Sequence, residues 1–114
     1  MSGQGPSEVT AAEAVALVHD GTYLLDVREQ DEWDAGHAPQ ATLVPLSELA
    51  QRQDEIPTDA QVLVVCHSGM RSLRATAALR AAGVDAVNVA GGMIAWRDAQ
   101  GELTGGSSSG PTVG

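Results

Sequence analysis

The sequence has 114 residues, 43% of them hydrophobic, a length and composition typical of one globular domain and not of a disordered chain. Six Lys and Arg residues against 15 Asp and Glu residues give a net charge of −9, which argues against nucleic acid and anionic membranes as partners. The single cysteine excludes an internal disulfide, and the three histidines show no metal-ligand spacing, so we expect no metal and no cofactor.

The first half of the chain predicts helices that alternate with strands. Thr10 and Glu13 have the spacing of a capping box, in which a hydroxyl and a carboxylate satisfy N–H groups at the start of a helix. Apolar periodicity and turn residues divide the rest of this half. The expected helices cover 11–19, 28–35 and 46–51, and the expected strands cover 23–27 and 41–44.

The second half continues this alternation, which favours an α/β domain with a mostly parallel sheet. Four consecutive apolar residues, 62–65, predict a central strand that is covered on both faces. A helix is expected over 70–82, a strand over 86–89, and a last helix from the Gly91-Gly92 turn through Trp96. One face of the helix over 70–82 is expected to be apolar, through Ala75, Ala78, Leu79 and Ala82.

The two ends of the chain are expected to be flexible, around one domain over 7–100. Residues 1–6 contain no basic region followed by an apolar run, so they do not resemble a signal peptide, and we expect a cytoplasmic protein. Residues 101–114 are rich in Gly and Ser, which is typical of a flexible tail.

The candidate chemistry is centred on Cys66, which stands where the strand 62–65 ends and the helix over 70–82 is about to begin. Ligands of open α/β sheets bind at the carboxyl ends of strands. Unpaired N–H groups and the positive end of the helix dipole favour an anion there, either a thiolate or a bound oxyanion. Arg71 adds a full positive charge, so we expect an activated, accessible thiol with a lowered pKa.

A buried, inert cysteine is the alternative, because a lone cysteine after a valine-rich strand is often a small hydrophobic residue. The polar segment that follows favours the reactive thiol, and its glycine permits a backbone conformation that larger residues resist. The candidate loop around Cys66 consists of His67, Ser68, Gly69, Met70, Arg71 and Ser72.

Other singled-out side chains are expected to be structural. Asp26 and Arg28, at the end of a strand, should pair with each other or with the loop backbone and support the site. Trp33 and Trp96 are expected to be core anchors, and His37 is expected to make a structural hydrogen bond.

Four segments, in order, resemble the rhodanese homology domain over residues 7–99. They are 25–29 (LDVRE), 32–39 (EWDAGHAP), 65–72 (VCHSGMRS) and 82–96, which contains AGV and GGMIAW. Any one segment is weak, but the four in this order and spacing form a strong signal. The chain has Gln40 where the family often has glycine, which affects only the local backbone.

The resemblance implies a five-stranded, mostly parallel sheet with helices on both faces. It implies that Cys66 takes a sulfane sulfur from a donor such as thiosulfate, forms a persulfide, and passes the sulfur to a thiol, cyanide or a protein acceptor. The N–H groups of 67–72 would hold the persulfide, and Arg71 would bind the anionic donor. This is covalent catalysis in two steps, for which ping-pong kinetics are expected.

Three other functions remain open. A phosphatase or arsenate reductase also uses a cysteine, an anion cradle and an arginine. The four residues between Cys66 and Arg71 argue against it, because the related phosphatases use five. A non-catalytic or regulatory module, acting as a sulfur carrier or binding another protein, is the second alternative, although such modules commonly lack the cysteine. A redox role for the lone thiol also remains.

Overall fold

The structure is a computed structural model that describes residues 7–113; residues 1–6, expected to be flexible, and residue 114 lie outside the described part. The capping box of Thr10 and Glu13 is confirmed at the start of the first helix. The elements in chain order are β1 (Glu8–Val9), α1 (Ala11–His19), β2 (Tyr23–Asp26), α2 (Gln30–Ala35), β3 (Thr42–Leu43), η1 (Leu46–Glu48), η2 (Gln53–Glu55), β4 (Gln61–Val65), α3 (Met70–Ala81), β5 (Asp85–Val89) and α4 (Gly92–Asp98).

The sheet confirms the expected α/β class. Its five strands within residues 7–113 run in the order β1-β5-β4-β2-β3, and every neighbouring pair is parallel. Strand β4 lies in the middle, so the loop that follows it opens at the centre of the carboxyl edge. Strand β1 was not predicted from the residue pattern, because two residues are too few to show a period.

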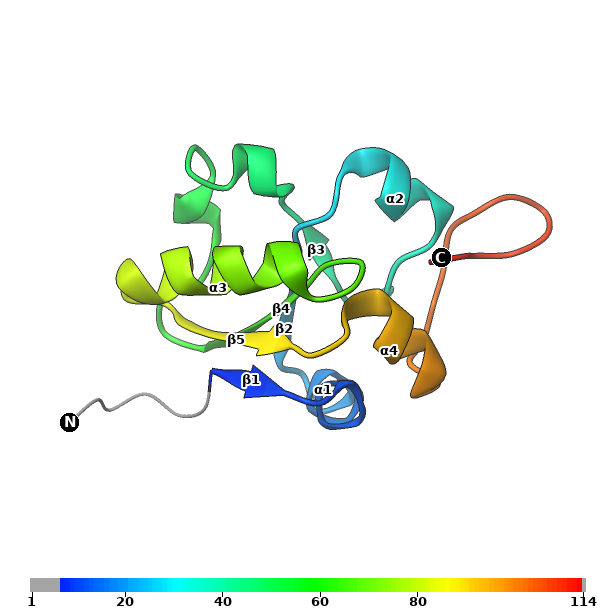
Figure 1. The fold of residues 1–114 in the computed structure, drawn as a ribbon, viewed down its shortest axis with the longest axis horizontal. Helices are drawn as coiled ribbons and strands as arrows, with labels where there is room; N and C mark the ends of the chain where they lie inside the picture. The colour runs from blue at the N-terminus through cyan, green and yellow to red at the C-terminus, as the bar shows by residue number, and fades with distance from the viewer. Residues whose placement is uncertain (1–6, 114) are drawn as a thin grey trace.

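Helices cover both faces of the sheet, α3 on one and α1 with α4 on the other (Figure 1). Successive side chains of a strand point to opposite faces. Leu24 and Leu63 therefore pack with α1 and α4, whereas their neighbours Leu25 and Val64 pack with α3. This alternation buries every residue of β2 and β4 except the first of each strand, which explains why both strands are nearly continuous apolar runs.

Some details of the helices differ from the expectation. The segment after Pro45 forms only the short 3-10 helix η1, not a helix over 46–51. On α3, Ala78 and Ala82 are exposed, so these two residues were wrongly placed on the apolar face. The buried residues of α3 are Ser72, Ala75, Thr76 and Leu79, a stripe that includes two hydroxyls. Apolarity alone could not identify that stripe, because alanine suits either environment.

The C-terminal segment, residues 101–113, packs on the domain at its two ends, while the loop between them projects outward beyond α2 (Figure 1). His37 and Thr104 exchange backbone hydrogen bonds of 3.0 and 2.8 Å, and Thr112 donates its N–H to the carbonyl of Ala35 at 2.8 Å. Val113 is buried in the core on the α1 and α4 side. Composition alone does not reveal this packing, and a domain boundary at residue 100 stays a prediction.

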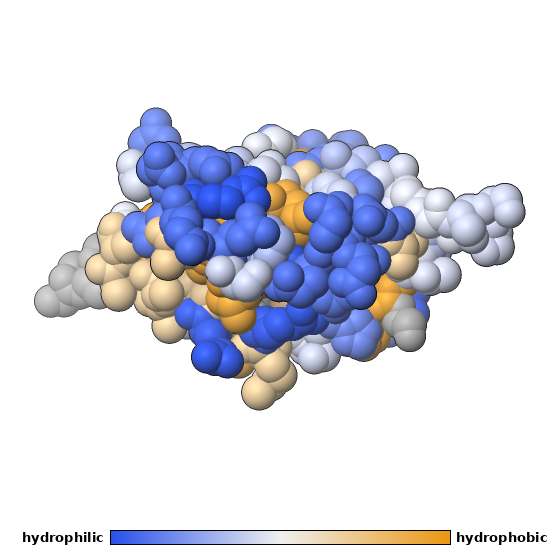
Figure 2. Space-filling model, turned by 90° about the horizontal axis from the view of Figure 1, so that it is seen from above, coloured by the Kyte–Doolittle hydropathy of each residue, from blue (hydrophilic) through white to orange (hydrophobic). Residues whose placement is uncertain are grey.

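The surface seen from above Figure 1 is largely hydrophilic, and its hydrophobic patches are small and lie between polar residues (Figure 2). In the part of the chain that the structure describes, no helix has both the length and the apolarity to cross a membrane.

Candidate functional site

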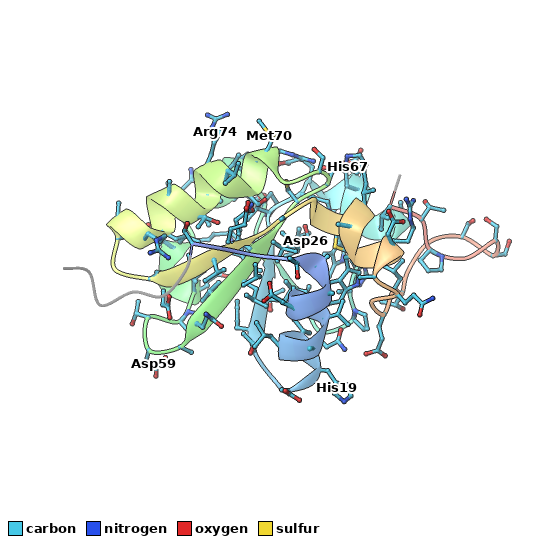
Figure 3. The ribbon with its side chains drawn as sticks, turned by 60° about the horizontal axis from the view of Figure 1, so that its bottom comes forward. His19, Asp26, Asp59, His67, Met70 and Arg74 are labelled. Carbon is cyan, nitrogen blue, oxygen red and sulfur yellow. The ribbon has the colours of Figure 1, made fainter. Side chains whose placement is uncertain are left out.

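The loop from Cys66 to Gly69 connects the end of β4 to the start of α3. Gly69 precedes the helix with a φ of +103°, in the left-handed region that side chains other than glycine resist. Through this conformation the loop turns back on itself, and the first N–H groups of α3 point towards the cysteine. In Figure 3, His67 lies in this loop, next to the N-terminal end of α3.

Three donors surround the sulfur of Cys66. The N–H of Gly69 lies 3.1 Å from Sγ, the N–H of Ser72 lies 3.3 Å from it, and the Ser72 hydroxyl is also 3.3 Å away. Burial raises the pKa of the Cys66 thiol, but hydrogen bonds from the Ser72 hydroxyl and from backbone N–H groups of Ser72, Gly69 and Ser68 outweigh it. The pKa of Cys66 is therefore lowered, and the arrangement stabilises a thiolate.

The thiol is less accessible than the sequence predicted. Cys66 is 1% exposed and packs in the core cluster on the α3 side of the sheet. The reason lies in the loop itself, because N–H groups that converge on a sulfur must enclose it.

The start of α4 holds the loop from the other side. The N–H groups of Met93 and Ile94 donate to the carbonyls of Cys66 and His67 at 2.7 and 3.2 Å. Gly92 has a φ of +59°, and a Cβ atom on it would collide with these two carbonyl groups. The close approach therefore requires glycine. It directs the two carbonyls towards α4, away from the sulfur.

Arg71 pairs with a carboxylate that the residue pattern did not identify as part of the site. Its two terminal nitrogens donate to the two oxygens of Glu32 at 2.7 Å each. The hydrogen bond with Arg71 lowers the pKa of Glu32 to about 2, against a smaller opposing effect of burial. The same bond raises the pKa of Arg71. Thirty-nine residues separate the two positions, so no local spacing signals this contact.

Asp26 and Arg28 pair with each other, as expected. Their side chains are 0% and 1% exposed, and Nη2 of Arg28 lies 2.8 Å from an Asp26 oxygen. Arg28 also donates to the carbonyl of Gly36 at 2.8 Å and to that of Glu32 at 3.3 Å. Its guanidinium thereby fixes the backbone of α2 to the end of β2.

The three expectations for Trp33, Trp96 and His37 differ in outcome. Trp96 is 1% exposed and belongs to the core, as expected. Trp33 is not a core anchor: it is only partly buried and stacks on the ring of His37 at 3.7 Å. Nδ1 of His37 lies 2.8 Å from the Trp33 carbonyl, which confirms a structural hydrogen bond.

A cavity of about 220 Å³ opens next to the loop. It is lined by Arg28, Glu32, Ala35, His67, Thr112 and Val113. Met70 and Arg74 lie outside it and project from α3 into solvent, while His19 lies on α1, at a distance from His67 (Figure 3). Within residues 7–113, no group of three His, Cys, Asp or Glu side chains is arranged to hold a metal ion.

The chain was compared with known proteins. A family model described as "Rhodanese-like domain" matches residues 10–99. The chain is 38% identical over 74 residues to the "Putative sulfurtransferase YtwF" of Bacillus subtilis, covering 65% of this chain and 72% of that protein. It is 37% identical over 105 residues to "Thiosulfate sulfurtransferase 18" of Arabidopsis thaliana, covering 79% of this chain and 77% of that one.

Solved structures give the same result. A rhodanese-related protein from Thermoplasma volcanium superposes with a TM-score of 0.79 at 28% identity, over 85% of this chain and 96% of that one. Other matches are to parts of longer chains: this chain spans 59% of the Bacillus subtilis protein YqhL and 17% of a Bacillus anthracis chain.

Proposed function

This chain belongs to the rhodanese-like domain family, and from that premise we propose that it is a sulfurtransferase that carries sulfane sulfur as a persulfide on Cys66. The observation that carries the proposal is the set of N–H and O–H donors around Sγ, which lowers the pKa of the thiol. The thiolate is the nucleophilic form of cysteine, so a lowered pKa increases the reactive fraction at neutral pH.

In the first half-reaction, the Cys66 thiolate attacks the outer sulfur of a donor such as thiosulfate. A new S–S bond forms to Sγ, the S–S bond of thiosulfate breaks, and sulfite leaves with the electron pair. In the second half-reaction, a thiol, cyanide or a protein acceptor attacks the terminal sulfur, and the Cys66 thiolate is released. The enzyme alternates between two covalent states, as ping-pong kinetics require.

The proposed roles of the loop follow from its contacts. The N–H groups between His67 and Ser72 stabilise the negative charge, first on the thiolate and then on the terminal sulfur of the persulfide. Arg71 is the cation nearest to this charge in sequence and provides the attraction for an anionic donor. Asp26 and Arg28 act as scaffold, because each is buried and bonded to the other.

Intact-mass analysis after incubation with thiosulfate tests the proposal. We expect wild type to gain the mass of one sulfur atom, the Cys66→Ser variant to gain none, and cyanide or a thiol to remove the added sulfur. An unmodified wild-type chain after incubation with thiosulfate and with a small-molecule hydrodisulfide would contradict the proposal. Phosphate esters and arsenate would then be the next substrates to test.

A sulfur carrier without rapid turnover is the second candidate. The 1% exposure of Cys66 favours it, because an enclosed persulfide is protected from small reductants until an acceptor engages the loop. The carrier would be favoured if the persulfide forms readily and its sulfur is transferred slowly to cyanide but faster to a protein acceptor.

A further inference from the structure

Arg71 is already paired with a carboxylate before any substrate arrives. Both of its terminal nitrogens donate to Glu32 at 2.7 Å, in the parallel two-bond geometry that gives arginine and carboxylate their strongest contact. The two side chains are 34% and 29% exposed, so the pair is only partly screened by water. A donor that needs the Arg71 guanidinium must therefore compete with a carboxylate already bound to it.

Arg28, the guanidinium that lines the cavity beside the loop, is also already paired. Asp26 neutralises it at 2.8 Å. Glu29 also acts electrostatically on Arg71, as does Cys66 itself. These side chains, two guanidiniums and three carboxylates, together with the Cys66 thiolate carry a negative total charge. This balance opposes the approach of a dianion.

Glu32 also forms part of the wall of the cavity beside the cysteine loop. It lines this cavity together with His67 and Thr112. Its low pKa, held near 2 by Arg71, keeps it ionised throughout the neutral range. The carboxylate therefore affects the site in two ways: it occupies the arginine and places a negative charge on the cavity wall.

We propose that Glu32 determines which donors this site accepts: it favours donors that react in an uncharged form, such as the protonated hydrodisulfide of an uncharged thiol, over dianionic thiosulfate. The inference rests on the proposed sulfurtransferase function. The reaction balances in the same way: the Cys66 thiolate attacks the outer sulfur of the protonated hydrodisulfide, a new S–S bond forms to Sγ, and the S–S bond of the donor breaks. The proton of the outer sulfur passes to the leaving thiolate, so the product thiol leaves neutral and the persulfide on Cys66 is ionised.

The test compares Glu32→Gln with wild type and with Glu48→Gln. Glutamine preserves the size of the side chain and an oxygen that can accept from the Glu29 N–H, which Glu32 binds at 3.0 Å. Glu48 pairs with Arg52 at 3.0 Å on the exposed surface, so its substitution is a matched control for losing one ion pair and one charge. The donors are thiosulfate and the hydrodisulfide of 2-mercaptoethanol.

We expect Glu32→Gln to raise kcat/KM for thiosulfate about fivefold, the factor that corresponds to about 1 kcal/mol for a partly exposed pair. The gain should appear in KM, because the freed guanidinium acts on donor binding. In Glu32→Gln, kcat/KM for the hydrodisulfide should change less than twofold. Glu48→Gln should leave kcat/KM unchanged for both donors. Adding Arg71→Ala to Glu32→Gln should abolish the gain for thiosulfate.

Glu32→Gln and wild type could show the same ratio of kcat/KM for thiosulfate to kcat/KM for the hydrodisulfide, while both donors still form the persulfide. That result would overturn this inference and leave the proposed function intact. So would a gain that persists without Arg71. If neither donor yields a persulfide in any variant, the proposed function fails, and this inference fails with it.

Discussion

The hydroxyl of Ser72 lies 3.3 Å from Sγ of Cys66, and the backbone N–H of the same residue lies at the same distance from that sulfur. One residue thus contributes two donors, of which only the hydroxyl can be removed by substitution. Because Ser72 is fully buried at the first turn of α3, its hydroxyl has no water to bind in place of the sulfur.

Replacing Ser72 with Ala is expected to raise the pKa of Cys66, because the thiolate loses a hydrogen bond while its burial is unchanged. The rise reflects the loss of one hydrogen bond to a charged group. The measurement is the rate of alkylation by iodoacetamide as a function of pH. Ser68→Ala is the control, since Ser68 acts on Cys66 through its backbone and is exposed. Equal pKa values in Ser72→Ala and Ser68→Ala would contradict this role.

The Glu32–Arg71 pair is expected to make stability depend on pH in acid. The pKa of Glu32 in the folded chain is about 2, below its ordinary value of 4.5. The contribution of Glu32 to the free energy of unfolding is therefore complete above pH 4.5 and is lost as the pH falls towards 2. We expect at most about 1 kcal/mol, because the pair is partly exposed. Urea unfolding measures the free energy of unfolding of wild type and of Glu32→Gln over this pH range. The difference between the two free energies should shrink as the pH falls, and a constant difference would contradict the prediction.

Asp26→Asn is expected to destabilise the chain by about 3 kcal/mol or more, because it leaves the guanidinium of Arg28 buried without a counter-charge. Asp98→Asn is the matched control: its ion pair with Arg97 is exposed, so the expected change is below about 0.5 kcal/mol. Urea denaturation measures both. A folded, stable Asp26→Asn variant that no longer takes up sulfur would instead assign Asp26 to the chemistry.

Gly36→Ala is expected to displace the C-terminal segment. Gly36 has an extended φ of 171°, which any residue can adopt, but a Cβ atom there would collide with the backbone of Thr112. Such crowding costs about 1–3 kcal/mol. In a chain that ends at residue 103, the same substitution should cost less than about 0.5 kcal/mol, because the colliding backbone is gone. Equal costs in both chains, measured by urea unfolding, would place the effect elsewhere.

Much of the fold could be predicted because its causes are local. The apolar runs of β2 and β4 and the capping box at Thr10 predict elements at their observed places. The position of Cys66 at the end of β4 follows in the same way. The ordered family segments added the fifth strand, which the two residues of β1 could not indicate.

What could not be predicted depends on contacts between distant residues. Glu32 reaches Arg71 across 39 positions, and Thr112 reaches α2 from the end of the chain. Neither contact has a periodic or compositional signal. The burial of Cys66 was missed for a related reason: the polar loop sequence predicted an accessible thiol, whereas the loop folds its backbone over the sulfur.

The contact between α4 and the cysteine loop also has a consequence for chain synthesis. The carbonyls of Cys66 and His67 are held by the N–H groups of Met93 and Ile94, residues that leave the ribosome more than two dozen positions later. Until α4 has docked, these two hydrogen bonds cannot hold the loop in the conformation that aims its N–H groups at the sulfur. We therefore expect the thiol of a nascent chain to gain its full reactivity only after the domain is nearly complete.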